Sequence, residues 1–267
     1  MKWDDFVEAL GEAANVGLEK LQQSRGERSE QSRVVETHEE TSATRQIDLT
    51  IQEAILSVLS DLPVKVISEE ESEERKGHPA DFFIVLDPID GTTNFDHGIP
   101  FYAISIAAGR KMNNEPKIED IEFGIILTVS GDRFAARKNE GASVNGSPIR
   151  TSQVEELEKA IIRPTSEFTK KDPALDRKFD SNLYLGSTAI ELALLAKGAV
   201  DIFVETKRRK VFDFAAAYLI AKEAGAVITD LQGNELDKKH VNKETRSTLI
   251  IAANEKLHRD ILKIYRQ

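Results

Sequence analysis

The sequence contains no cysteine, which excludes disulfide bonds, a catalytic thiolate and cysteine-ligated zinc or iron–sulfur clusters. It also lacks any stretch of the roughly 20 apolar residues that a membrane-spanning helix needs. The N-terminal segment, MKWDDFVEALGEAANVGLEKLQ, carries acidic side chains where a signal peptide has an uninterrupted apolar core. These absences predict a cytoplasmic protein without a membrane partner.

Basic residues are fewer than acidic ones, 36 against 46, which gives a formal net charge of −10. Because nucleic acid repels such a chain, we expect no nucleic-acid partner. With 40% hydrophobic residues, the chain can bury a sizeable core. Its 267 residues allow one large domain or two closely packed lobes.

Hydrophobic spacing predicts a mixture of helices and strands. Helical patterns cover residues 3–21, 48–59, 188–197, 213–224 and 255–265, and strand patterns cover 64–67, 82–86, 103–108, 123–129, 134–136, 161–163, 183–185, 199–204, 227–229 and 249–253. The polar segment Ser24–Glu40 is either a loop or an extended hairpin, and we hypothesise that it is mobile and near the site. The mixture predicts a layered α+β or α/β fold with two lobes, 1–150 and 151–267.

The stretch Phe82–Phe95, FFIVLDPIDGTTNF, carries the clearest chemical signal. An apolar strand delivers Asp87, and Asp90 follows three residues later. When two carboxylates lie this near to each other, a cation between them is favoured, and oxygen ligands select Mg²⁺, Mn²⁺ or Ca²⁺ over zinc. Gly91 allows close backbone approach, and a helix starting at Thr92 offers N–H groups to a phosphate. Taken alone, the same residues also form good turn chemistry.

Two other acidic signals are ambiguous by themselves. Asp213 opens an alanine-rich helical pattern, where a capping role alone explains an aspartate. The run Glu69–Glu71 follows the predicted strand 64–67, and acidic runs are usually solvated. Ligand sites of open α/β sheets lie at strand ends, so one of these glutamates is a candidate for the same edge as Asp87. The basic cluster Lys207–Lys210 is either solvated surface or a reader of a second phosphate or sugar hydroxyls.

Taken in order, these elements resemble the inositol monophosphatase superfamily of metal-dependent sugar and inositol phosphatases. The matching strings are Glu69-Glu70, DPIDGT at 87–92, GASVNG at 141–146, LGSTA at 185–189, FDFAA at 212–216 and KEAGA at 222–226. The similarity spans nearly the whole chain, and residues 43–49 look most like archaeal members acting on fructose 1,6-bisphosphate and inositol 1-phosphate. Ser68 and Phe212 depart from the family's usual glycine and tryptophan without removing a carboxylate.

The resemblance implies a five-layer αβαβα sandwich, a homodimer and Mg²⁺ as cofactor, two or three ions, with Mn²⁺ as a substitute. The N-terminal lobe then carries the metal-binding motifs, and the C-terminal lobe contributes Asp213 and the substrate contacts. Counting from Ser68 favours Glu70 as the ligand over Glu69 and Glu71. The implied metal ligands are Glu70, Asp87, the Ile89 carbonyl, Asp90 and Asp213.

The resemblance also implies catalytic and substrate-binding roles. Asp48 and Thr92, together with the metal ligand Glu70, form the catalytic set that acts on the attacking water. Phosphate and substrate contacts fall to Asp90, Gly91, Thr92, Gly186, Ser187, Thr188, Glu205, Arg209, Lys210 and Asp213. The predicted reaction is hydrolysis of a small phosphate monoester by water, without a phosphoenzyme.

Two rival interpretations stay open. A nucleotide phosphatase of the same superfamily, acting on 3′-phosphoadenosine 5′-phosphate or NADP, shares every metal ligand and differs only in its ring contacts. A basic pocket with an aromatic platform for adenine would favour it. The other rival, a non-catalytic metal-binding interaction protein, is disfavoured because the carboxylate set is intact.

Overall fold

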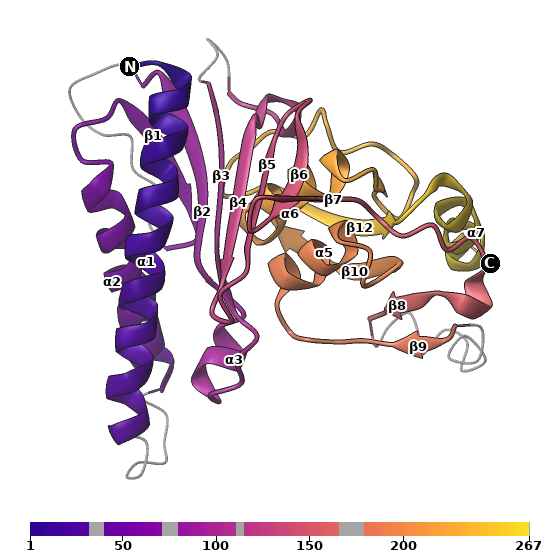
Figure 1. The fold of residues 1–267 in the computed structure, drawn as a ribbon, viewed down its shortest axis with the longest axis horizontal. Helices are drawn as coiled ribbons and strands as arrows, with labels where there is room; N and C mark the ends of the chain where they lie inside the picture. The colour runs from indigo at the N-terminus through magenta and orange to yellow at the C-terminus, as the bar shows by residue number, and fades with distance from the viewer. Residues whose placement is uncertain (32–39, 71–79, 111–114, 166–178, 267) are drawn as a thin grey trace.

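The computed structural model describes residues 1–31, 40–70, 80–110, 115–165 and 179–266. Two β-sheets organise this part of the chain (Figure 1). The first contains, in spatial order, β1 (Val64–Ser68), β2 (Phe82–Asp90), β3 (Ala103–Arg110), β4 (Phe123–Thr128), β5 (Arg133–Arg137), β6 (Gly141–Val144) and β7 (Ser147–Ile149). Strands β1 and β2 are parallel, whereas each later neighbour pairs antiparallel.

The second sheet is mixed and follows a different order. It contains β11 (Val227–Thr229), β12 (Arg246–Ala252), β10 (Ile202–Lys210), β8 (Ile161–Arg163) and β9 (Ser181–Asn182) as successive neighbours. The α-helices are α1 (Trp3–Gln31), α2 (Glu40–Val58), α3 (Thr92–Asp96), α5 (Thr188–Ala196), α6 (Val211–Glu223) and α7 (Glu255–Arg266). Short 3₁₀ turns cover Ile118–Asp120 and Leu157–Lys159.

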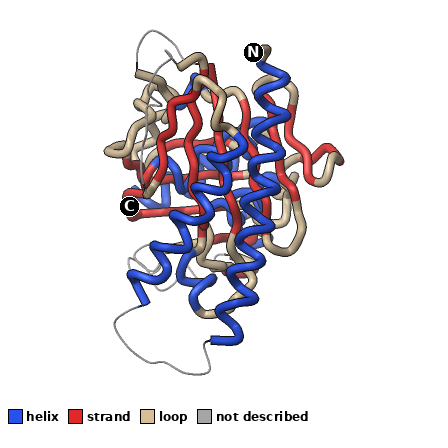
Figure 2. Tube along the Cα trace, turned by 90° about the vertical axis from the view of Figure 1, so that its left-hand side faces the viewer, coloured by secondary structure: helices blue, strands red, loops and turns tan. Residues whose placement is uncertain are grey.

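Three hydrophobic cores hold five layers of helices and sheets together. One core lies between α1, α2 and one face of the first sheet, and Figure 2 shows these helices side by side across that face. A second core joins the opposite face to α5, α6 and the second sheet. The third lies between the second sheet and α7. The predicted layered α+β sandwich is therefore confirmed; the division into lobes at residue 150 stays a prediction.

Three local predictions were wrong. Helix α1 continues through Ser24 to Gln31 where we expected a loop or hairpin, because the only weak helix former there is Gly26, at a cost of about 1 kcal/mol. Of the rest of that segment, Glu40 begins α2, and residues 32–39 lie outside the described part of the chain, as does Glu71. The strand expected at 183–185 lies instead at Ser181–Asn182, and β10 begins at Ile202 and runs on to Lys210.

Candidate active site

The end of β2 places two carboxylates inside the protein. All nine residues of β2 are buried, as expected for a strand covered on both faces, and Asp87 and Asp90 are only 3% and 7% exposed. The Asp87 carboxylate accepts the backbone N–H of Ile89 at 3.0 Å. The register against β3 shifts between Asp87 and Asp90, so this bulge aims the two side chains independently.

The turn after Asp90 depends on a glycine. Gly91 has φ of 102°, and a Cβ there would lie 2.8 Å from the carbonyl oxygen of Phe101, so a larger residue is excluded both by conformation and by space. Helix α3 follows at once, and the Thr92 hydroxyl donates to the Ile89 carbonyl at 3.0 Å. The turn therefore fixes the Ile89 carbonyl and the Thr92 hydroxyl against each other.

Two further strand ends meet the end of β2. Strand β1 is parallel to β2 with Ser68 opposite Leu86, so Glu69 follows beside Asp87. Strand β10 leads directly into α6, whose first turn carries Asp213. Ligand oxygens of Glu69, Asp87 and Asp213 all lie within 4.8 Å of one another. Residues distant in sequence thus form one carboxylate group.

Asp213 is not the N-cap residue of α6, which is the role that the sequence alone suggested for it. The N-cap of α6 is Lys210, and the Asp213 carboxylate accepts the Lys210 backbone N–H from within the first turn. An acidic group there is also favoured by the helix dipole. Asp213 therefore both accepts the N–H of the N-cap residue and belongs to the carboxylate group.

Burial and mutual repulsion raise the pKa values of Asp87 and Asp213. Burial, followed by repulsion from Asp90, Glu69, Asp213 and Asp48, raises the pKa of Asp87 well above its usual range. Burial and repulsion from Glu69 raise the pKa of Asp213 to about 6, against attraction from Arg209 and Lys210. Such a group binds a cation readily, since the cation relieves the repulsion that the protein imposes.

Asp90 is held differently from Asp87. Its carboxylate accepts the Ser187 hydroxyl and, at 2.8 Å, the Ala189 backbone N–H at the start of α5. Burial raises its pKa to about 7 in spite of these two hydrogen bonds. Gly186 precedes Ser187 with φ of 81°, and Thr188 is buried in the first turn of α5. The segment predicted to contact substrate is therefore hydrogen-bonded directly to Asp90, at the end of β2.

The acidic run contributes Glu69 where sequence reasoning favoured Glu70. Among the described residues, Glu70 is not one of the three carboxylates within 4.8 Å, although its carbonyl accepts Lys243 Nζ at 3.4 Å. The Glu69 carboxylate also accepts Lys210 Nζ at 2.9 Å. Asp48, on α2, is 8% exposed and close enough to raise the pKa of Asp87.

A buried ion network supports the other side of the site. Arg163 on β8 donates from Nε to Glu191 at 2.7 Å and from Nη1 to Glu205 at 3.3 Å, and all three side chains are 1% exposed. Glu205 also accepts Arg209 Nε at 2.9 Å, so two predicted substrate residues are paired with each other. Sequence reasoning missed Arg163 and Glu191; a charge inside an apolar strand and another inside an alanine–leucine helix were the available signals.

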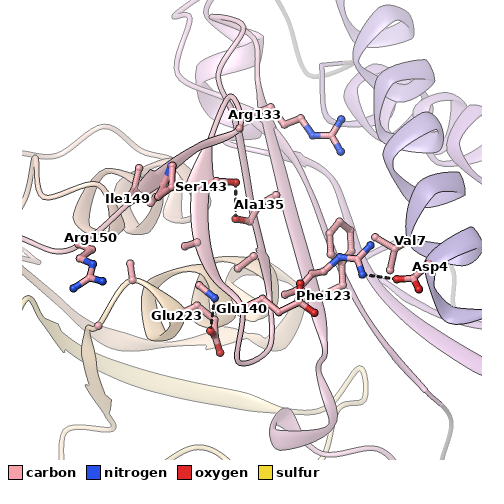
Figure 3. Close-up of a pocket in the computed structure, with 18 of the residues that line it drawn as sticks. Asp4, Val7, Phe123, Arg133, Ala135, Glu140, Ser143, Ile149, Arg150 and Glu223 are labelled. Carbon is pink, nitrogen blue, oxygen red and sulfur yellow. Dashed lines mark hydrogen bonds and ion pairs between the residues drawn. The ribbon is translucent and has the colours of Figure 1, made fainter.

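A separate cavity of about 1040 Å³ lies between α1 and the strands β5–β7 (Figure 3). Its lining shares no residue with the predicted site. Arg137 forms an ion pair with Asp4. The Arg133 guanidinium extends to Gly11 of α1, and Figure 3 shows the Arg133 side chain pointing toward that helix. The carboxylate group at the strand ends and this cavity are therefore separate features of the structure.

Comparison with known proteins identifies one family. The model of the Inositol monophosphatase family matches residues 2–267. The chain is 34% identical over 227 residues, 83% of each sequence, to the fructose-1,6-bisphosphatase/inositol-1-monophosphatase of Archaeoglobus fulgidus. It is 32% identical over 258 residues to the bifunctional NADP phosphatase/NAD kinase of Methanococcus maripaludis, in an alignment covering 87% of this chain and 44% of that protein. The chain thus spans under half of the latter relative.

The fold is also found among solved structures. The crystal structure of the extragenic suppressor protein SuhB from Bartonella henselae superposes with a TM-score of 0.78 at 26% identity, covering 98% of this chain and 100% of the other. In the described part of the chain, no helix is both long and apolar enough to cross a membrane.

Proposed function

The chain belongs to the inositol monophosphatase family, and we therefore propose that it hydrolyses small sugar and inositol phosphate monoesters with Mg²⁺ held by its carboxylates. As a member of this family it is a phosphoric monoester hydrolase. The observation that carries the finer proposal is the group formed by Glu69, Asp87 and Asp213. Fructose 1,6-bisphosphate and inositol 1-phosphate are the proposed substrates, in the cytoplasm and in a homodimer.

The donor set fits Mg²⁺ or Mn²⁺. Its atoms are carboxylate oxygens and the Ile89 carbonyl, which hard divalent cations prefer, and the raised pKa values of Asp87 and Asp213 reflect negative charge in need of a cation. Glu69, Asp87, Ile89, Asp90 and Asp213 would hold the ions, with Glu70 as the alternative glutamate. A bound ion of this kind lowers the pKa of water and neutralises charge on a phosphoryl group.

The residues around this group bind and orient the reactants. The Thr92 hydroxyl donates a hydrogen bond to the Ile89 carbonyl. The lone pairs of the Thr92 oxygen are then available to accept a hydrogen bond from water. Asp48 is the proposed partner that takes up the proton of that water. The backbone N–H groups of Gly91 and Thr92 are the proposed phosphate donors. Positioning of this kind is the main requirement of phosphoryl transfer, so no phosphoenzyme is needed.

The proposed substrate contacts beyond the phosphate are Gly186, Ser187, Thr188, Glu205, Arg209 and Lys210. The hydrogen bond between Ser187 and Asp90 supports this placement, because it puts the segment directly beside the carboxylates. Arg209 is held by Glu205 and stays partly exposed, so its remaining donors are available to a second phosphate.

A nucleotide phosphatase is the second candidate. One observation favours it: Tyr184, just before the Gly186–Ser187 segment, is 64% exposed and is close enough to Arg209 of β10 to help raise the pKa of that guanidinium. The relative from Methanococcus maripaludis, named a bifunctional NADP phosphatase/NAD kinase, agrees with that candidate. A non-catalytic metal-binding role is the third and least supported, because the carboxylate set is intact.

The proposal is tested by phosphate release with and without Mg²⁺ from fructose 1,6-bisphosphate, inositol 1-phosphate, 3′-phosphoadenosine 5′-phosphate and NADP. Strong metal-dependent turnover of the first two supports the sugar and inositol phosphatase. Preference for the other two promotes the nucleotide phosphatase. If a protein that binds Mg²⁺ releases no phosphate from any of the four compounds, the enzymatic proposal is overturned.

A further inference from the structure

Asn94 joins two segments of the candidate site that are far apart in the sequence. It lies in α3 and is 7% exposed. Its Nδ2 donates to the carbonyl of Leu185 at 2.6 Å, 91 residues further along the chain, and to the carbonyl of Phe101 at 2.7 Å. Both amide hydrogens are bound in this way by backbone oxygens. Asn94 therefore ties the backbone before α5 to the backbone before β3.

Glu191 binds the same stretch of backbone from α5. Its Oε1 accepts the N–H groups of Leu185 and Gly186 at 2.6 and 3.0 Å, and its Oε2 accepts Arg163 Nε at 2.7 Å. Leu185 thus has its N–H held by one helix and its carbonyl by another. At Gly186, φ is 81° and a Cβ would lie 3.0 Å from Asn94 Nδ2, so the chain passes close to this amide. The backbone at 185–186 is therefore fixed between Asn94 and Glu191.

The residues that follow reach Asp90 from this fixed backbone. The Ser187 hydroxyl and the Ala189 N–H both donate to the same oxygen of Asp90, Oδ2. Two donors on one oxygen set the rotation of the carboxylate, and with it the direction of the other oxygen, Oδ1. The position of Ser187 depends on that of Gly186, because the two are consecutive and the peptide bond between them is planar. The orientation of Asp90 therefore depends on the backbone at 185–186.

We propose that Asn94 and Glu191 are positioning residues for Asp90, acting through the backbone that precedes α5. This rests on the proposed function, in which Asp90 is one of the Mg²⁺ ligands. Groups that hydrogen-bond to a ligating carboxylate orient it, and their loss weakens metal binding or activity about 10–100-fold. The two groups that donate to Asp90 are of this kind, and Asn94 and Glu191 hold the backbone that carries them.

Two variants of Glu191 separate its contact with the backbone from its charge. Glu191→Gln and Glu191→Met both lose the ion pair with Arg163, but only the amide oxygen of glutamine still accepts the N–H groups of Leu185 and Gly186. We expect calorimetry to show Mg²⁺ binding within about three-fold of wild type for Glu191→Gln, and about ten-fold or more weaker for Glu191→Met. Equal affinities in the two variants would overturn the proposal.

Asn94→Leu tests the contact from α3, because leucine has a similar shape and no donor. We expect about ten-fold weaker Mg²⁺ binding, and an equal rise in the Mg²⁺ concentration that gives half-maximal phosphate release. The matched control is Asn254→Leu, which removes an amide that donates to the Val154 carbonyl at 2.7 Å just before α7. A loss of stability lowers the amount of active protein in either variant without changing this Mg²⁺ concentration. Equal weakening in both variants contradicts the proposal.

Hydrogen exchange of the metal-free protein checks the same link without metal or turnover. The N–H groups of Leu185, Gly186 and Ala189 donate to carboxylates in wild type, so we expect their exchange to be faster in Asn94→Leu and unchanged in Asn254→Leu. If exchange and Mg²⁺ affinity change as expected while wild type hydrolyses no phosphate ester, the phosphatase function fails and the positioning role stands. If wild type hydrolyses the esters and Asn94→Leu keeps its Mg²⁺ affinity, the positioning role fails and the function stands.

Discussion

The ammonium of Lys210 lies 2.9 Å from the carboxylate of Glu69, one of the three carboxylates whose oxygens lie within 4.8 Å of one another. Lys210 therefore supplies part of the positive charge that a divalent cation would bring to this group. Attraction to Lys210 also opposes the rise in the pKa of Asp213. A cation entering the group competes with this lysine for Glu69.

Replacement of that lysine should tighten metal binding. In Lys210→Met, Glu69 has no ion pair that must break before a metal ion binds, and the carboxylate group carries one more uncompensated negative charge. We expect Mg²⁺ to bind roughly three- to ten-fold more tightly in calorimetry, in line with the strength of a partly exposed ion pair. The control, Lys243→Met, removes the same charge from a lysine whose ammonium donates to the Glu70 carbonyl. Equal effects of both variants would show that overall charge, and not the contact with Glu69, sets the affinity.

The two neighbouring glutamates should differ as metal ligands. Glu69→Gln removes a carboxylate from the group that contains Asp87 and Asp213, so we expect at least about ten-fold weaker Mg²⁺ binding. Glu70→Gln should weaken binding less than about three-fold. Calorimetric titration of both variants checks this, and a larger loss in Glu70→Gln would restore the assignment based on the sequence count.

The strand ends were predictable because their signals are local. The apolar run of β2 with the aspartates that follow it indicated both burial and a cation site, and Asp87 and Asp90 lie where that pattern put them. The choice between Glu69 and Glu70 was not accessible in the same way. It depends on the parallel register of β1 with β2, and no sequence pattern specifies a register to one residue.

The residues that sequence reasoning missed act through tertiary contacts. Arg163 and Glu191 come from two different elements and form a network with Glu205, a predicted substrate contact, only once β8, α5 and β10 pack together. Tyr184 looked like part of a strand, and only its exposure and its contact with Arg163 distinguish it. The polar residues Ser24–Gln31 looked like a loop because they contain no apolar side chain whose spacing would show that α1 continues.

Asp87 should be essential for activity and dispensable for folding. Burial and repulsion from four other carboxylates raise its pKa well above the usual range, and it is the central oxygen donor of the proposed metal site. Asp87→Asn keeps the shape and removes the charge, so we expect loss of Mg²⁺-dependent phosphate release with an unchanged circular dichroism spectrum. Activity within ten-fold of wild type would contradict the assignment of this group as the metal site.

The metal-free protein should lose stability as the pH rises through about 6. The pKa of Asp213 is raised to about 6, so the folded state holds its proton more tightly than the unfolded chain does. The resulting contribution to stability is complete below the unfolded-state pKa of about 3.9 and is lost as the pH rises through about 6. Chelator-treated wild type should therefore unfold at a lower temperature at pH 7.5 than at pH 5.

Asp213→Asn separates this effect from others, because an amide does not ionise. Without metal, we expect the variant to exceed wild type in free energy of unfolding by about 1–2 kcal/mol at pH 7.5 and to match it near pH 4, after allowance for the partial exposure of Asp213. Added Mg²⁺ should reverse the order at pH 7.5, since only wild type keeps the ligand charge. Thermal unfolding over this pH range measures both, and parallel curves for the two proteins would refute the argument.

Arg163 should be the most costly of the ion-pair residues to replace. It is buried with Glu191 and Glu205, all three 1% exposed, so Arg163→Met leaves Glu191 in the interior without this cation and leaves Glu205 with Arg209 as its partner. Removal of one partner from such a buried network costs about 3–5 kcal/mol, and we expect a loss of that size in urea unfolding. Lys159→Met, which breaks an ion pair with the exposed Glu156, should leave the urea midpoint unchanged. If the Arg163 variant is also no less stable than wild type, Glu191 takes up a proton at little cost, and the buried network does not stabilise the fold.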